Sequence, residues 1–325
     1  MILITSAAGG VGRPLVRDLS QRGLPVRAFV KNEQQARLVR NAGATEVVVG
    51  DLKRPGDLEA AVAGARQLYH AAPTQIIDEV PIARRLIAAA GENGVEHLLF
   101  HSVIHPEIPE LTHHHQKLLV EGLLKESGLP VTVLRPSHYM QNYLDFWDLL
   151  QAGILTYPFS PDRIMGVVDV EDVAQAALEV LLAPESHLGQ TYDLSTQALD
   201  RHQMARIWSR VLGHPVTAIR LPPDALNNPL AAAGALGPAV VRSLARTGLR
   251  STPALARGLV RAPNARGVRG WPEDAREAYV RMLTYYDGHG LPPGDLTHLP
   301  ALLGRAPTEY ADFARREAAV RGAVR

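Results

Sequence analysis

The chain has 325 residues, of which 46% are hydrophobic and 21% charged, a composition that excludes an intrinsically disordered chain. Its length allows two domains, or one large domain with a smaller lobe. The formal net charge of +1 disfavours nucleic acid as the main partner, and the absence of cysteine excludes disulfides and thiolate metal sites.

No pattern in the chain predicts secretion or a membrane span. Met1 leads directly into strand-like residues rather than into a secretory signal. The longest stretch without polar side chains, residues 229–241, is too short to cross a bilayer and contains proline and glycine. We therefore expect a cytoplasmic protein in a reducing compartment that acts on a small molecule. The sequence leaves open whether the chain forms a homodimer.

The first half of the chain alternates short apolar runs with amphipathic helical patterns, which predicts a parallel sheet covered on both faces. We expect this doubly wound Rossmann domain over residues 1–145. The predicted strands are residues 2–5, 26–30, 46–49, 68–71, 97–102 and 131–135. The predicted helices are residues 12–22, 33–42, 57–62, 80–93 and 113–127.

The second half, residues 146–325, is predicted to form a smaller, mainly helical substrate lobe. Short strands near 167–170 and 191–194 are expected to return to the core, with a helix over 171–182 between them. From residue 201 onward the pattern is mostly helical and interrupted by prolines. The lobe carries no motif that identifies a substrate.

One segment of the lobe has an unusual charge pattern. No acidic residue occurs between Ala225 and Pro272, whereas seven arginines occur there: Arg242, Arg246, Arg250, Arg257, Arg261, Arg266 and Arg269. A solvated helix face is the simplest interpretation. A subunit contact, a funnel for an anionic substrate and a membrane-surface patch are the alternatives.

The start of the chain carries its strongest functional signal. An apolar run from Ile2 enters a turn with the spacing G-x-x-G-x-x-G, in which Ser6 replaces the first glycine before Gly9 and Gly12. A strand, a glycine turn and a helix present backbone N–H groups to a phosphate, so the pattern predicts dinucleotide binding. Serine disfavours the positive φ that this first position requires.

Four segments together resemble the NmrA-like branch of the atypical short-chain dehydrogenase/reductase superfamily. They are the glycine turn at 5–12, Gly-Asp-Leu at 50–52, residues 94–103, and a long stretch through 113–117, 127–130, 134–137 and 140–142. Residues 303–308 resemble the closing segment of that family. The resemblance implies a Rossmann core that binds NAD(P)H, in a family that includes quinone and triphenylmethane-dye reductases and cofactor-sensing regulators.

The end of the second predicted strand indicates which cofactor is bound. An acid there bonds the ribose 2′-OH of NAD, whereas a cation accommodates the 2′-phosphate of NADP. Lys31 stands at this position, and Arg13 adds a second cation near the phosphates. We therefore expect NADP(H) to be preferred over NAD(H).

The resemblance places Asp51 and the next backbone N–H, that of Leu52, against adenine, although an Asp in this setting also forms turns. It also places Tyr139, with Asn142, beside the nicotinamide and the substrate. The complete set of predicted cofactor contacts is Ser6, Gly9, Gly10, Val11, Gly12, Arg13, Lys31, Asp51, Leu52, Ala72, Lys117 and Tyr139.

Lys117 is the main catalytic candidate. In the superfamily, a lysine four residues after a tyrosine binds the nicotinamide ribose and lowers the pKa of the tyrosine. Here His113 stands where the tyrosine would be, so the usual proton donor is missing. His113, His114 or water is expected to supply the proton. The resemblance further implies that Ser102 polarises the substrate carbonyl; a strand-end hydroxyl bonded to backbone is the alternative.

These residues lead to one main hypothesis and two alternatives. The main hypothesis is an NADPH-dependent reductase that transfers hydride to an electron-poor carbonyl, quinone-like or iminium small molecule. The missing tyrosine favours a non-catalytic NADP(H)-sensing regulator as the first alternative. An epimerase or lyase with bound NAD is the second, and Lys31 argues against it. Three successive histidines at 113–115 point about 100° apart on a helix, so no metal site is expected.

Overall fold

The computed structural model describes residues 1–247 and 251–323. Contacts divide the chain into two units, each of which combines separate stretches of sequence. The first unit consists of Met1–Ser137, Val170–Ser195 and Gly294–Pro307, and the second of His138–Asp169, Thr196–Pro293 and Thr308–Arg325. This division differs from a single boundary near residue 145, because two later stretches of chain return to the first unit.

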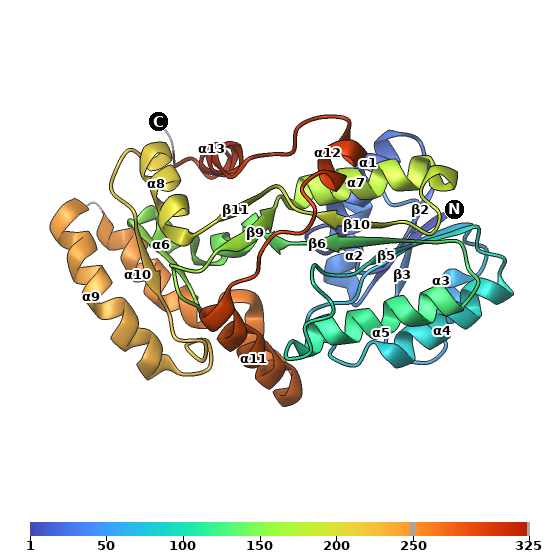
Figure 1. Ribbon diagram of the computed structural model, residues 1–325, viewed down its shortest axis with the longest axis horizontal. Helices are drawn as coiled ribbons and strands as arrows, with labels where there is room; N and C mark the ends of the chain where they lie inside the picture. The colour runs from blue at the N-terminus through green and yellow to red at the C-terminus, as the bar shows by residue number, and fades with distance from the viewer. Residues whose placement is uncertain (248–250, 324–325) are drawn as a thin grey trace. The chain divides into compact units, whose positions relative to one another are not determined.

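The first unit is built on a seven-stranded sheet in which every strand pairing is parallel (Figure 1). The strand order is β10-β6-β5-β4-β1-β2-β3. This is the Rossmann order with one strand added beside β6. The strands are β1 (Ile2–Ile4), β2 (Val26–Val30), β3 (Glu46–Val49), β4 (Gln67–His70), β5 (His97–His101), β6 (Val131–Pro136) and β10 (Thr191–Leu194).

Helices cover both faces of this sheet (Figure 1). On one face α3, α4 and α5 pack against each other in succession, and on the other α7 packs against both α1 and α12. The helices are α1 (Gly12–Gln21), α2 (Glu33–Asn41), α3 (Asp57–Val62), α4 (Val80–Glu92), α5 (Thr112–Glu126), α7 (Val170–Leu182) and α12 (His298–Leu303). The first six strands and first five helices thus lie within two residues of their predicted ends.

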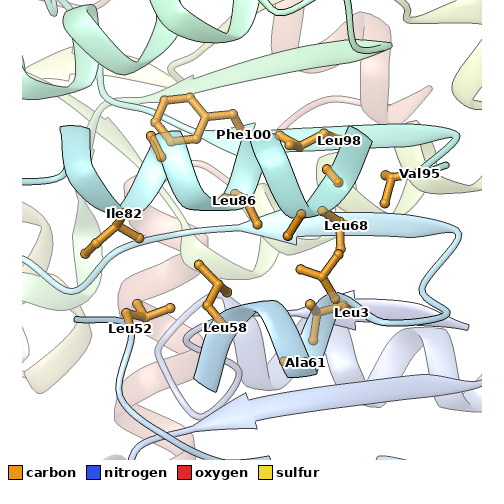
Figure 2. Close-up of a cluster of buried hydrophobic side chains, with 14 of the residues drawn as sticks. Leu3, Leu52, Leu58, Ala61, Leu68, Ile82, Leu86, Val95, Leu98 and Phe100 are labelled. Atoms are coloured by element: carbon orange, nitrogen blue, oxygen red, sulfur yellow. The ribbon is translucent and has the colours of Figure 1, made fainter. Parts of the chain in front are cut away.

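The core on the α3–α4 face shows why these sequences fold this way (Figure 2). Three leucines from neighbouring strands of the sheet, Leu3, Leu68 and Leu98, point toward the apolar sides of α3 and α4, where Leu58 and Leu86 are almost fully buried. Strands covered on both faces need nearly continuous apolar sequences, and β1 and β5 are buried at every position. Burial on both faces therefore sets the strand positions.

The second unit contains two small sheets rather than strands added to the main sheet. One has the order β11-β9-β7, and the other pairs β12 with β8 in parallel. Its strands are β7 (His138–Tyr139), β8 (Ile154–Tyr157), β9 (Met165–Val168), β11 (Gln197–Leu199) and β12 (Thr217–Arg220). Its helices are α6 (Trp147–Gln151), α8 (Arg201–Leu212), α9 (Pro229–Thr247), α10 (Thr252–Arg261), α11 (Glu273–His289) and α13 (Tyr310–Val320).

The two strands predicted to return to the core lie in different sheets. The strand at 191–194 is β10, which pairs with β6 at the edge of the main sheet, as predicted. The strand predicted at 167–170 is β9, which ends at Val168 and pairs with β7 and β11 of the second unit. That part of the prediction is wrong, because the short strands 138–139 and 197–199, which carry little periodicity, supply its partners.

Candidate cofactor and reaction site

The glycine turn after β1 is held by its own side chains. Ser6 adopts a positive φ of 49°, in spite of the cost for a residue with a Cβ. Its hydroxyl donates to the carbonyl of Ala71, at 2.7 Å, and the N–H of Ala71 donates to Thr5 Oγ1, at 2.9 Å. These bonds tie the turn to the end of β4, so Ser6 forms the turn that a glycine was expected to form.

The space around Gly12 requires a glycine at this position of the turn. A Cβ on Gly12 would lie 2.6 Å from the carbonyl oxygen of Ser6 and 2.9 Å from the Cα of Ala7. Gly10 is exposed, and a Cβ there would meet no atom within 4 Å. The N-cap of α1, Val11, offers no side-chain acceptor, and the first turn of the helix has no acid. The exposed backbone and the helix N-terminus therefore form a cradle suited to a phosphate.

The ends of β2 and β3 carry the predicted adenine-side residues. Lys31 is exposed immediately after β2, and the next residue, Asn32, caps α2 by accepting the N–H of Gln35, at 2.9 Å. Asp51 accepts the N–H of Lys53 at 2.9 Å, while the N–H of Asp51 donates to Asp57 Oδ2 at 2.9 Å. Asp51 thus forms a local turn at the sheet edge predicted for adenine.

Lys117 is a buried cation with a buried counter-charge. Its Nζ donates to Oε2 of Glu79, at 2.7 Å, and to the carbonyl of His101, at 3.2 Å. The Nζ also lies 5.1 Å from the centre of the Phe100 ring. An ammonium group has three donors, and these two contacts use two of them. Burial raises the pKa of the Glu79 carboxyl, and the charge of Lys117 opposes that shift.

The side of α5 that carries Lys117 also binds both ends of the segment 74–79. His113 Nε2 donates to the carbonyl of Thr74, at 2.7 Å, and Gln116 Oε1 accepts the N–H of Glu79, at 3.1 Å. Residues 113, 116 and 117 lie on neighbouring positions of one helix face. The Nε2 proton of His113 is therefore engaged with backbone, and its catalytic role stays a prediction.

Ser102 forms part of a second, partly buried charge cluster. Its hydroxyl donates to Oε1 of Glu121, which also accepts the Nε of Arg135, at 3.0 Å. Nη2 of Arg135 donates to the other oxygen of Glu121. A hydroxyl has a single proton, so Ser102 cannot donate to a substrate carbonyl while it donates to Glu121.

Three histidines next to this region are held neutral. Burial, and then the charge of Lys117, lowers the pKa of His70 and of His101 to about 3. Burial also lowers the pKa of His114 to about 4, while its Nδ1 donates to the carbonyl of His105, at 3.1 Å. None of the three is a strong proton donor at neutral pH.

Sequence reasoning did not identify Glu79 or Glu121 as site residues. Glu79 lies 38 positions before Lys117, and Glu121 lies 14 positions before Arg135, so no local spacing pattern links them. Glu79 directly precedes the helix start at Val80-Pro81, but its side chain makes no capping hydrogen bond there. Glu79 is buried and Glu121 is partly buried, and a carboxylate removed from water requires a cation that the fold must supply.

Tyr139 belongs to the second unit, where burial raises its pKa, and its contact with the cofactor stays a prediction.

In residues 1–247 and 251–323, no group of three metal-ligating side chains comes together. No helix in the described part of the chain is long and apolar enough to cross a membrane. Of the predicted arginine face, Arg250 lies outside the described residues.

An open parallel sheet with a glycine cradle at its first strand defines a Rossmann protein of the dinucleotide-binding class. The sequence model of the NmrA-like family matches residues 1–240 of this chain, so the chain belongs to this family.

Relatives extend over most or all of the chain. It is 26% identical over 328 residues to an NAD(P)H azoreductase of Xenophilus azovorans, covering 100% of both chains. It is 31% identical over 239 residues to a (4-alkanoyl-5-oxo-2,5-dihydrofuran-3-yl)methyl phosphate reductase of Streptomyces griseus, covering 71% of this chain and 81% of that protein.

Solved structures share the fold at low identity. The structure of a triphenylmethane reductase from Citrobacter sp. superimposes with a TM-score of 0.72 at 22% identity, covering 98% of each chain. At this identity the likeness shows the fold alone.

Proposed function

We propose that this chain is an NADPH-dependent reductase that transfers hydride to an electron-poor carbonyl, quinone-like or iminium small molecule. The single observation that carries the proposal is the cradle after β1, where Gly12 has no room for a side chain and the helix N-terminus has no side-chain cap. At the level of class, an NAD(P)H-dependent reductase is confirmed by relatives of that name. The choice of NADPH and of the acceptor is our proposal.

The residues at the carboxyl edge of the sheet suit such a cofactor. The backbone at Gly9–Gly12 would hold the pyrophosphate, with Arg13 exposed beside it. Lys31 is an exposed cation at the end of β2, where a 2′-phosphate would be bound. Asp51, Leu52 and Ala72 follow β3 and β4 at the same edge. When bound, the reduced nicotinamide supplies the hydride.

Lys117 is proposed to bind the ribose of that nicotinamide through the donor that Glu79 and His101 do not use. The position of its ammonium is set by two hydrogen bonds and the Phe100 ring, so little conformational entropy is lost on binding. The neighbouring carboxylate stabilises the ammonium in this buried place. Glu79 therefore acts as a positioning residue for Lys117.

Proton delivery is assigned to water. The Nε2 proton of His113 is donated to Thr74, and the pKa of His114 is lowered to about 4, so the imidazole of His114 is neutral at pH 7. The Ser102 hydroxyl proton is donated to Glu121. Because none of these three side chains has a proton to give, the site suits acceptors that take hydride with little assistance, which is why we propose quinone-like and iminium compounds.

Fluorescence titration with NADPH and NADH tests the cofactor, and a panel of quinone, dye and carbonyl acceptors added to the tighter complex tests turnover. We expect tighter binding of NADPH. Lys31→Glu should raise the Kd for NADPH about tenfold without raising that for NADH, because only NADPH carries the 2′-phosphate and an acid at this position can bond the ribose 2′-OH of NADH. Lys125→Glu, an exposed lysine near the end of α5, is the control. Binding of NADPH without turnover of any acceptor would favour a cofactor sensor, and equal affinity for both cofactors would contradict the NADPH assignment.

A further inference from the structure

Helices α9 and α10 of the second unit have unusually apolar solvent faces. Leu230 and Val241 of α9 are 85% and 68% exposed, and Val260 of α10 is 76% exposed. Leu259, next to Val260, is also exposed. From Leu230 to Val241 the helix carries no charged side chain. Large apolar side chains gathered in this way indicate a surface that is covered in use.

The two helices arrange their exposed residues in the same manner. Consecutive helical residues point about 100° apart. On α9, Leu230 and Val241 therefore share one stripe, and Arg242 points about 100° away from Val241. Arg246 lies farther round the helix and donates to Thr217 Oγ1, at 2.9 Å. On α10, Leu259 points about 100° away from Val260, and Arg257 and Arg261 flank Val260 on the other side. Each helix thus combines exposed apolar side chains with arginine on one flank.

Few acids compensate these arginines. None occurs from Ala225 to Pro272. Arg257 and Arg261 both pair with Asp148, at 3.0 and 2.9 Å, so two guanidinium groups share one carboxylate. Arg261 is mostly exposed even in this pair. The face formed by α9 and α10 is therefore both apolar and positively charged.

We propose that this face docks on the surface of an anionic lipid bilayer. Exposed leucine and valine side chains would enter the boundary between headgroups and acyl chains, while the arginines bind lipid phosphates. A second copy of the chain is a poorer occupant, because a two-fold contact would place arginines of like charge against each other. The docking is peripheral, and it does not depend on the function proposed above.

The first test is sedimentation of the full chain with large vesicles. Vesicles of phosphatidylglycerol and phosphatidylcholine in equal parts should bind the protein, and vesicles of phosphatidylcholine alone should not. High salt should weaken the binding, because it screens the arginines. Arg242→Gln should weaken it about fivefold.

The decisive variant is Val241→Glu/Val260→Glu, which puts a charge among the exposed apolar side chains of each helix. We expect it to lower vesicle binding about tenfold or more. Val320→Glu is the matched control, because Val320 of α13 is 79% exposed in the same unit but lies outside both helices. Circular dichroism establishes that all variants are folded.

Other outcomes would overturn the proposal. Equal binding to both kinds of vesicle, no binding to either, or an equal loss in Val320→Glu would each do so. A wild-type dimer that becomes monomeric in Val241→Glu/Val260→Glu, without vesicle binding, would assign the face to a second copy instead. Light scattering distinguishes that result, and NADPH titration reports the proposed function separately.

Discussion

The two units bury a positive charge in different ways. In the first unit, Lys117 pairs with the buried carboxylate of Glu79, at 2.7 Å. In the second, the fully buried Arg201 lies 4.6 Å from the centre of the Phe159 ring and donates to the carbonyl of Phe159. Burial lowers the pKa of Arg201 to about 10. Among the described residues, its Nε and Nη1 have no hydrogen-bond partner.

This difference separates a charge that can serve a ligand from one that mainly fills space. A lysine with a counter-carboxylate keeps its charge while part of its hydrogen-bonding capacity stays available for a ligand. An arginine packed on an aromatic ring, with unused donors, contributes mainly by filling space. The comparison predicts that the first unit responds strongly to changes of charge and the second only weakly.

The largest expected effect is acid destabilisation of the first unit. Burial lowers the pKa of His70 and His101 to about 3 and that of His97 and His114 to about 4. Since the unfolded chain takes up protons below about pH 6.5, the stability is complete above that pH and is lost as the pH falls toward these values. Each histidine should lower the free energy of unfolding by about 1.4 kcal/mol per pH unit in this range.

Urea unfolding at pH 7, 6 and 5, with hydrogen exchange resolved by peptide, measures this loss. In the second unit, burial likewise lowers the pKa of His138 to about 3, against the four histidines named above for the first unit. Peptides of the first unit should therefore lose protection more steeply. His114→Gln should reduce the slope, while His115→Gln, at the exposed neighbour, should not. Equal loss of protection in both units would contradict the comparison.

The second effect is the loss of the buried ion pair. Lys117→Met leaves the Glu79 carboxylate buried without its cation, which should lower the free energy of unfolding by about 3–5 kcal/mol. The penalty should shrink as the pH falls, because burial raises the pKa of Glu79 and the carboxyl then protonates. Adding Glu79→Gln should restore much of the stability. A double variant as unstable as Lys117→Met alone would show that charge is not the cause.

The third effect concerns the cradle. Gly12→Ala would place a Cβ 2.6 Å from the Ser6 carbonyl oxygen, so the turn must shift. We expect the Kd for NADPH to rise about a hundredfold, equivalent to about 2.7 kcal/mol. Gly122→Ala in α5, where a Cβ meets nothing within 4 Å, is the control. Unchanged affinity in Gly12→Ala would mean that the cofactor is bound elsewhere.

The smallest effect is expected in the second unit. Arg201→Met replaces a buried cation by an apolar side chain of similar length, and the stability should change by about 1 kcal/mol or less, or increase. Urea unfolding measures it beside Lys117→Met. A loss as large as that of Lys117→Met would remove the distinction between the two buried cations.

The sequence by itself determined the order of strands and helices in the first unit and the position of the glycine cradle. These features depend on local patterns: apolar runs such as that of β1 must be buried, and Gly9 and Gly12 are spaced along one turn. It also singled out Lys117, because a lysine at that spacing belongs to a family motif. Local chemistry is sufficient for the strands, the helices and the cradle, whereas Lys117 was singled out by the family resemblance.

Only the tertiary structure decided how the charges are used. Glu79 reaches Lys117 across 38 residues, and Ser102 bonds Glu121 instead of facing open solvent. The strand at 165–168 was assigned to the wrong sheet for the same reason, since its partners at 138–139 and 197–199 are distant and short. Burial makes each charge and each strand edge require a partner, and the partner is selected by the fold rather than by neighbouring sequence.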